Sequence, residues 1–287
     1  MVRKSAGGAA SVRSVRGIPV AIRYASLALL SGIFLAAVCS SWLAPARYEQ
    51  QFRLETDSPP NAKFLLGTDH LGRDRLSRLL YGTRVSLLLA PAAAALALLI
   101  ALLAGGSAAL AGGWWDRVVT AASNLFLSLP WLFLFLTVRA VLPLNTGPST
   151  SILITFGLMG LLGWGAGARV IRAAVLQVRN SPFALYAHAF GCNPGRLWLR
   201  HLLPHLRTVL LAQFWISVPA FILGEASLGL LGLGVAEPMP SWGNLLKELQ
   251  TAPQWHEYWV FAPIVLLSLV MVLFQLSRPA KQEAATA

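Results

Sequence analysis

The stretch RVIRAAVLQVRNSPFALYAHAFGCNPGRLWLRHLLPHLR, residues 169–207, holds six arginines and no acidic residue. Apolar segments long enough to cross a bilayer flank it on both sides. Basic loops between membrane spans are retained on the cytoplasmic side during insertion. Ser181-Pro182 and Asn193-Pro194 are each typical of a helix start, because proline is favoured directly after a capping residue. The stretch therefore predicts a membrane protein with a folded cytoplasmic loop that contacts a partner.

The composition of the whole chain agrees with a membrane protein. The sequence is 56% hydrophobic and 12% charged, whereas soluble domains have about 25% charged residues. Most of its uncharged runs reach the roughly 20 residues that cross about 30 Å of hydrocarbon as a helix. A soluble protein with a large core would not need six such runs, which are 24–46, 85–115, 118–138, 140–168, 208–224 and 258–277. We expect an all-α integral membrane protein.

Six transmembrane helices are predicted, near residues 24–44, 86–109, 118–140, 151–168, 208–231 and 258–277. The expected divisions are a cytoplasmic tail (1–23), a first transmembrane helix (24–44), an extracytoplasmic loop (45–84), a membrane domain (85–278, including the 169–207 loop) and a cytoplasmic tail (279–287). The net charge of +12 lies mostly in the tail and the loops, so topology explains it better than nucleic-acid binding. The extracytoplasmic loop fits the charge rule least, because it has seven basic residues beside five acidic ones.

Within the basic loop, an apolar stripe predicts a docking helix. Gly191 is placed to end the helix that starts at Pro182, and Pro204 is expected to end the second helix. Four residues of the first helix share one face at helical spacing, namely Phe183, Tyr186, Ala187 and Phe190. Such a stripe either enters a groove on a partner or packs on the protein's own spans. The residues alone leave both interpretations open.

This loop resembles the EAA loop of permeases from binding-protein-dependent ABC importers. The resemblance rests on Ala187-x-x-x-Gly191, followed twelve residues later by Leu203-Pro204, with the run 200–204 close to the peptide and nickel branch. It implies the type I permease fold, with a cytoplasmic coupling helix that enters a cleft on an ATPase subunit. The contact residues would be Phe183, Leu185, Tyr186, Ala187, Phe190, Gly191 and Pro204. The glutamate that names the motif would fall at Leu185, so one charged contact with the ATPase is missing.

Residues 67–87, GTDHLGRDRLSRLLYGTRVSL, resemble the segment that enters the core of second-subunit permeases in the same family. The signature positions are Gly67, Thr68, Asp69, Gly72, Arg73 and Asp74. The alternative is that Asp69, Arg73, Asp74 and Arg78 form exposed ion pairs, each worth less than about 1 kcal/mol. Together the resemblances cover about residues 64–263, and the family's usual ending does not follow.

Residues 225–243, EASLGLLGLGVAEPMPSWG, resemble the family's segment that closes the fifth span. Glu225 is the one acid inside this apolar run, and Arg139 lies at the end of another. Ionisable groups at membrane depth are costly and indicate function. We hypothesise that the two side chains approach each other, or that Glu225 faces a water-filled path. The alternative is that Glu225 caps a short helix after a break at Gly224.

Catalytic and metal-binding patterns are not found in the sequence. It has no glycine-rich phosphate loop, so ATP and its Mg²⁺ are expected on separate ATPase subunits. Its five histidines form no recognisable metal motif, and no serine has a partnered base. The resemblance implies a heterodimer with a homologous permease, two ATPase subunits and an extracytoplasmic solute-binding protein, in the lipid of the inner membrane. No nucleic-acid partner is expected.

Two other classes of protein remain as alternatives. An ion-coupled secondary transporter would need several acids at mid-membrane or inverted repeats, and one such acid is present. An integral-membrane enzyme would need polar residues that converge at one depth. Neither pattern is found, so a non-enzymatic transport subunit is predicted. Its solute could be a dipeptide, an oligopeptide, nickel or a metal chelate.

Overall fold

A computed structural model describes residues 19–141, 147–182, 186, 195, 198–251 and 258–278. The expected cytoplasmic tails lie almost wholly outside these residues, as does the expected coupling helix apart from Pro182 and Tyr186. Within the described ranges the protein is helical, and its two β-bridges are isolated residue pairs in the segment 51–74. The all-α prediction is confirmed.

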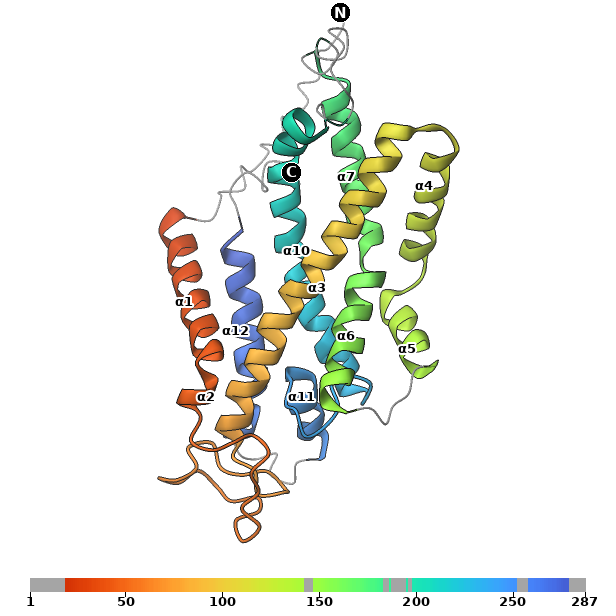
Figure 1. Cartoon of the computed structure of the whole chain (residues 1–287). Coiled ribbons are helices and arrows are strands. Elements are labelled where there is room, and N and C mark those ends of the chain that lie inside the picture. The colour runs from red at the N-terminus through yellow and green to blue at the C-terminus, as the bar shows by residue number, and fades with distance from the viewer. Residues whose placement is uncertain are drawn as a thin grey trace, which may run out of the picture.

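The helices form an elongated bundle around one long central helix, α3 (Figure 1). Before it come α1 (Val20–Val38) and the short α2 (Ser40–Leu43). After α3 (Arg75–Ala111) follow α4 (Gly113–Ser128), α5 (Trp131–Val141), α6 (Pro148–Leu162), α7 (Trp164–Arg179), a π-helical turn (Trp198–Leu202), α10 (Leu203–Leu230), α11 (Trp242–Thr251), a 3-10 turn (Tyr258–Phe261) and α12 (Ala262–Leu276). Among the described helices, α3 contacts α7, α10 and α6 most extensively.

Five continuous helical stretches are long and apolar enough to cross a membrane, and the bent pair α4–α5 can supply a sixth. The stretches are Val20–Val38, Arg75–Ala111, Pro148–Arg179, Leu203–Leu230 and Tyr258–Leu276. Several exceed their apolar runs: α3 starts at residue 75 instead of 86, and α7 continues to 179 instead of ending at 168. The predicted boundaries were too short because charge ends an apolar run, whereas a helix satisfies its own backbone on both sides of the lipid surface.

The expected span 118–140 is not one straight helix. Its two halves, α4 and α5, meet at 92° around Leu129 and Pro130. Proline disfavours a helical conformation in the residue before it, and Leu129 has an extended backbone with ψ 133°. An uncharged run shows only that charged residues are absent, so it does not reveal this break in the helix.

Small side chains line the central contacts of α3. Its buried face is largely alanine, with Ala90, Ala94, Ala97 and Ala101 almost fully enclosed. Small residues let membrane helices approach closely and associate by van der Waals packing. A second apolar cluster joins the C-terminal half of α3 to α7 and α10, through Ala101, Ala109, Ala168, Ile171, Val175 and Leu206.

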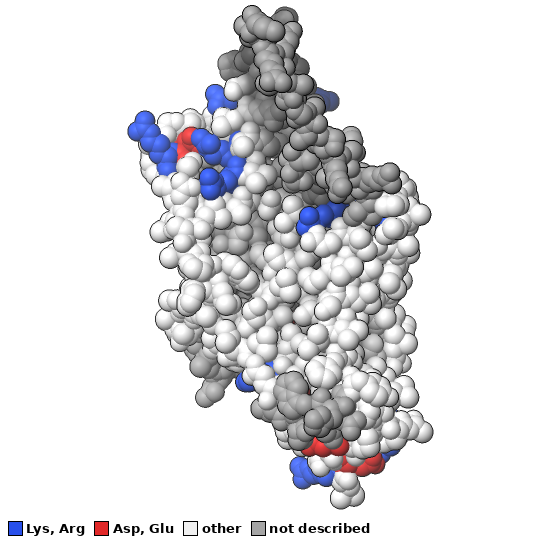
Figure 2. All heavy atoms as spheres, turned by 180° about the vertical axis from the view of Figure 1, so that it is seen from behind, with Lys and Arg blue, Asp and Glu red and all other residues white. Residues whose placement is uncertain are grey.

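Charged side chains gather toward the two ends of the bundle, with a broad uncharged band between them (Figure 2). The end where α1 begins, α7 ends and α10 begins lies at the top of Figure 1. We call it the loop-bearing end, because it carries the segment 180–202. The opposite end, formed by residues 44–74 and α11, is called the network end.

Candidate functional site

The segment 67–74 folds into a tight loop at the network end, directly before α3. Gly67 and Gly72 have φ values of 68° and 72°. Residues with a Cβ rarely adopt this conformation, whereas glycine adopts it readily. A Cβ at either position would lie 2.3 Å from a backbone oxygen, that of Ser58 or of Phe52. The backbone of this loop therefore requires glycine at both positions.

The polar members of the signature also hold this loop. Asp69 Oδ1 accepts hydrogen bonds from the backbone N–H groups of Leu71 (2.9 Å) and Arg73 (2.8 Å). Asp74 caps α3 by accepting from the N–H of Ser77 at 2.9 Å. Thr68 accepts from the N–H of Ser58 at 2.9 Å. The loop is organised by side chains that bond to its own backbone.

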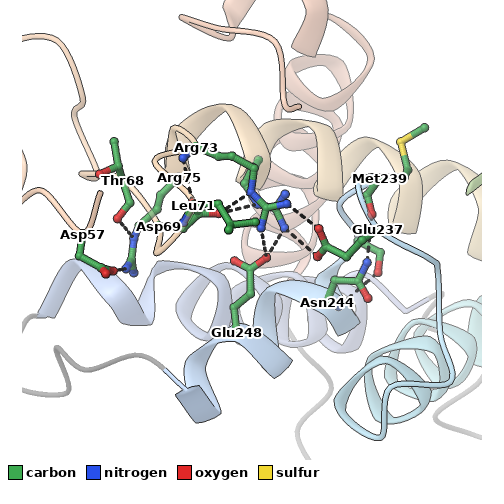
Figure 3. A network of polar contacts seen from close by, with 12 residues as sticks. Asp57, Thr68, Asp69, Leu71, Arg73, Arg75, Glu237, Met239, Asn244 and Glu248 are labelled. Atoms are coloured by element: carbon green, nitrogen blue, oxygen red, sulfur yellow. Dashed lines mark hydrogen bonds and ion pairs between the residues drawn. The ribbon is translucent and has the colours of Figure 1, made fainter. Parts of the chain in front are cut away.

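Two arginines extend from this loop and the start of α3 to acids far along the chain. Arg73 Nε lies 2.6 Å from Asp69 Oδ2, and its Nη1 bonds to Glu237. Its Nη2 lies 3.3 Å from Glu248 Oε1 on α11. Arg78 contacts the same two acids through Nη2. Figure 3 shows the Arg73 guanidinium between Asp69 and the two glutamates.

The alternative of exposed ion pairs is wrong for this cluster. The side chains of Arg73 and Arg78 are 3% and 0% exposed, and Asp69 and Asp74 are buried as well. Breaking a buried pair by removing one partner leaves an uncompensated charge, which destabilises by about 3–5 kcal/mol. Two of the acids that pair with these arginines, Glu237 and Glu248, lie more than 150 positions away in the sequence.

The charges of this network shift one another's pKa values. Burial lowers the pKa of the Arg73 guanidinium, but its hydrogen bond to Glu237 and the charge of Asp69 outweigh that effect and raise it. Burial raises the pKa of the Glu237 carboxyl, but the charge of Arg78 and the hydrogen bond from Arg73 outweigh burial and bring this pKa below its usual value. For Glu248, burial outweighs Arg78 and Arg73, so its pKa is raised. The two glutamates differ because Glu237 is half exposed and Glu248 is mostly enclosed.

Sequence reasoning missed α11 and the role of Glu248. A signal was present: Trp242, Leu245 and Leu249 follow helical spacing, and all three side chains are buried. The indole N–H of Trp242 donates to Thr83 Oγ1 at 3.1 Å. This bond attaches α11 to α3 beside the arginine network.

Glu225 lies deep in the bundle, with 0% of its surface exposed. Its Oε2 accepts a hydrogen bond from Ser86 on α3 at 2.9 Å, and the Ser86 oxygen accepts from the N–H of Trp242 at 3.2 Å. Its Oε1 faces the first turn of α11, where a Cβ at Gly243 would lie 2.9 Å away. One carboxylate thus joins α10, α3 and the N-terminus of α11.

The expected cap at a break after Gly224 is wrong, because α10 continues through Gly224 to Leu230. Glu225 is nevertheless next to a helix N-terminus, that of α11, which favours a negative charge. The helices can approach this closely because Gly229 and Gly243 meet: a Cβ at Gly229 would lie 2.3 Å from the Gly243 Cα. Arg139 lies on α5 with its side chain outside the described residues, so its approach to Glu225 stays a prediction.

The expected ATPase contact can be placed only at its edges. Tyr186 is 67% exposed, whereas Phe183, Leu185, Ala187, Phe190 and Gly191 lie outside the described residues. Pro204 does not end a helix. It lies in the first turn of α10, directly after the π-helical turn Trp198–Leu202. A proline ring clashes with the carbonyl four residues earlier in a regular α-helix, and here that residue, Arg200, is in the wider π turn.

Among the described residues, no group of histidine, cysteine and acidic side chains could hold a metal ion. The charged cluster at the network end is a set of ion pairs that joins segments. Its ion pairs hold residues 69–78 against Glu237 and Glu248.

Comparison with known proteins places the chain in a transport family. Residues 85–279 match the family of binding-protein-dependent transport system inner membrane components. The chain is 32% identical to the dipeptide transport system permease protein of Bacillus subtilis, covering 91% of this chain and 80% of that protein. It is 34% identical to the di/tripeptide transport system permease protein of Pseudomonas aeruginosa, covering 84% and 79%.

A third relative, the oligopeptide transport system permease protein of Bacillus subtilis, is 30% identical over 84% of this chain and 77% of its own length. The family match over residues 85–279 includes the bent pair α4–α5, the α6–α7 pair, α10 and α12, together with most of α3. The resemblance seen in the sequence is therefore confirmed. This chain is a multi-pass membrane protein and belongs to the family of binding-protein-dependent transport system inner membrane components.

Proposed function

We propose that this protein is a permease subunit of an ATP-driven ABC importer that takes up dipeptides or oligopeptides. The observation that carries the proposal is the family match over 85–279, joined to relatives whose names specify peptide transport. A nickel or metal-chelate solute has less support, because the relatives named above are all peptide permeases.

The loop-bearing end would be cytoplasmic, with both termini on that side. Its described charges are mainly basic: Arg117, Arg172, Arg179, Arg200 and Arg207 stand beside one acid, Asp116. The network end carries both signs, with Asp69, Glu237 and Glu248 around its arginines. The rule that basic segments stay in the cytoplasm supports this orientation in the inner membrane.

One such chain would form half of the translocation path and would pair with a homologous permease. Two ATPase subunits would dock on the segment 180–202, and a solute-binding protein would deliver peptide at the network end. ATP and Mg²⁺ would be held by the ATPase subunits. Transport would then require no catalytic residue in this chain.

The mechanism would use the two helices that border the docking loop. ATP-driven closure of the ATPases would move that loop, tilting α7 before it and α10 after it. At its far end α10 contacts α11 through Glu225 and through the close approach of Gly229 and Gly243. Tilting of α10 would therefore shift α11 and the arginine network, opening one end of the path as the other closes.

Reconstitution tests this proposal. The chain, its homologous permease, the ATPases and the binding protein are placed in proteoliposomes, and uptake of labelled dipeptide, a longer peptide and nickel is measured. We expect peptide uptake that requires ATP and every subunit. Uptake by the chain alone with an imposed ion gradient would contradict the proposal and favour a secondary transporter. ATP-dependent nickel uptake without peptide uptake would overturn the assigned solute.

A further inference from the structure

The loop-bearing end holds an ion pair that the mechanism above does not use. Arg172 on α7 contacts Asp116 on α4 twice: Nε bonds to Oδ1, and Nη2 lies 2.6 Å from Oδ2. Bidentate arginine–carboxylate pairs are strong and directional. In the described part of this end, Asp116 is the one acidic side chain among several arginines. The pairing therefore uses the single acid of the region to join α4 to α7.

A second arginine of α7 binds the end of the preceding helix. Arg179 Nη1 donates to the carbonyl oxygens of Ala109 (2.7 Å) and Leu110 (3.3 Å). Because α3 ends at Ala111, these carbonyls belong to the last turn, which lacks intrahelical donors and carries the negative end of the helix dipole. A guanidinium is well suited to this position.

The two arginines contact the two helix ends that meet at the α3–α4 connection. They are seven residues apart, which places them two turns apart on one face of α7. Asp116 lies in the first turn of α4, and Ala109 in the last turn of α3, so the arginines bind both helix ends that flank Gly112. We call this arrangement the arginine clamp. Beneath it, the second apolar cluster already packs α7 against α3.

We infer that Arg172 and Arg179 are positioning residues that transmit movement of the 180–202 loop to the α3–α4 turn. The inference rests on the proposed function. Arg179 is the last residue of α7, directly before the loop, so displacement of the loop at its α7 end would move the clamp. Figure 1 shows α7, the end of α3 and the start of α4 together at this end. Through the clamp, one docking loop moves α3 and the bent pair α4–α5 in addition to α7 and α10.

The first experiment separates coupling from assembly. Arg172→Ala, Asp116→Ala and Arg179→Ala are compared with Arg169→Ala, an exposed arginine of the same helix that serves as a matched control. Co-purification of the ATPases, basal ATP hydrolysis, hydrolysis stimulated by the binding protein, and peptide uptake per assembled complex are measured. We expect assembly and basal hydrolysis to persist. Stimulated hydrolysis and uptake should fall roughly twofold to thirtyfold, the range of mutations along coupling networks, whereas Arg169→Ala should match the wild type.

Unchanged uptake per complex in Arg172→Ala would overturn the inference while leaving the proposed function intact. If the wild-type complex itself fails to take up peptide with ATP, the proposed function fails first. The double alanine variant of Asp116 and Arg172 adds a second check. Its loss of uptake should equal that of either single variant, because both remove the same contact. Fully additive losses would also contradict the clamp.

A distance measurement tests the movement itself. Spin labels at the exposed positions Trp114 on α4 and Val170 on α7, with Cys39 and Cys192 replaced by serine, report the separation of the two helices. We expect the same distance in nucleotide-free and ATP-trapped complexes, because the clamp moves both helices together. In Arg172→Ala the distance should change on ATP trapping. A nucleotide-dependent distance in the intact clamp, or a constant one in the variant, would overturn the inference.

Discussion

The charged side chains at the two ends of the bundle are arranged in opposite ways. At the network end, Arg73 and Arg78 are buried among Asp69, Glu237 and Glu248, so the charges compensate one another inside the chain. At the loop-bearing end, one acid meets several arginines, and most of the positive charge faces outward. The first arrangement joins distant segments of one polypeptide. The second leaves basic charge for membrane topology and for a partner. Stability should therefore depend mainly on charges at the network end.

Arg78→Ala should produce the largest effect. It removes a fully buried cation and leaves Glu237, Glu248 and Asp69 without it, which should destabilise the protein by about 3–5 kcal/mol. Thermal unfolding in detergent, followed by size-exclusion fluorescence, measures the loss. Arg207→Ala is the control from the loop-bearing end, where an exposed arginine should change stability by no more than about 0.5 kcal/mol. Equal effects of the two substitutions would remove the contrast between the ends.

Gly229→Ala should have the next largest effect, because it separates α10 from α11. The new Cβ would lie 2.3 Å from the Gly243 Cα, and such overpacking costs about 1–3 kcal/mol. The control is Gly157→Ala on α6, where nothing lies within 4 Å of the new Cβ. That substitution should be neutral or stabilise the helix by up to about 1 kcal/mol. Melting temperatures of both variants decide the matter, and a stable Gly229→Ala would contradict the close approach.

Substitutions of Glu225 should have an effect of similar size and distinguish two roles of its side chain. Glu225→Ala leaves the buried Ser86 hydroxyl without its acceptor, a loss of about 1–3 kcal/mol. Glu225→Gln keeps an oxygen that can accept this bond, so its melting temperature should lie nearer the wild type. Uptake separates the two roles considered for this residue. Full transport by Glu225→Gln would exclude a role of the Glu225 charge in the transport path. The remaining role would be the structural contact between α10 and α11.

The smallest expected effect is the pH dependence of the pair Arg73–Glu237. The pKa of Glu237 is lowered in the folded protein, so its stabilising contribution is present above the usual value of about 4.3 and disappears as the pH falls below it. Since Glu237 is half exposed, the contribution should stay below about 1 kcal/mol.

The melting-temperature difference between the wild type and Glu237→Gln, measured from pH 7 to pH 3, reads out this contribution. It should shrink on acidification. Glu248 has a raised pKa, so Glu248→Gln should gain stability relative to the wild type as the pH rises. The same trend in both variants would show that the two glutamates are equivalent.

Much of the membrane architecture could be predicted by counting residues. The runs between charges located α1, α3, α6, α10 and α12, because a bilayer imposes a minimum apolar length that is visible in composition. Breaks and overhangs were harder. Pro130 divides one expected span, and α3 and α7 extend past their apolar runs. A helix ends where its backbone bonding ends, and charge does not mark that point.

The candidate sites show the same division. The sequence by itself determined that the chain crosses the membrane several times and that its basic loop lies between spans. It also predicted a transport family, which the match over residues 85–279 confirms. Only the tertiary structure decided that Arg78 meets Glu248, that Glu225 faces the start of α11, and that Arg172 meets Asp116. The reason is physical. Hydrophobic length and local turn geometry are properties of neighbouring residues, whereas a buried charge is tolerated only beside partners that folding brings from distant parts of the chain.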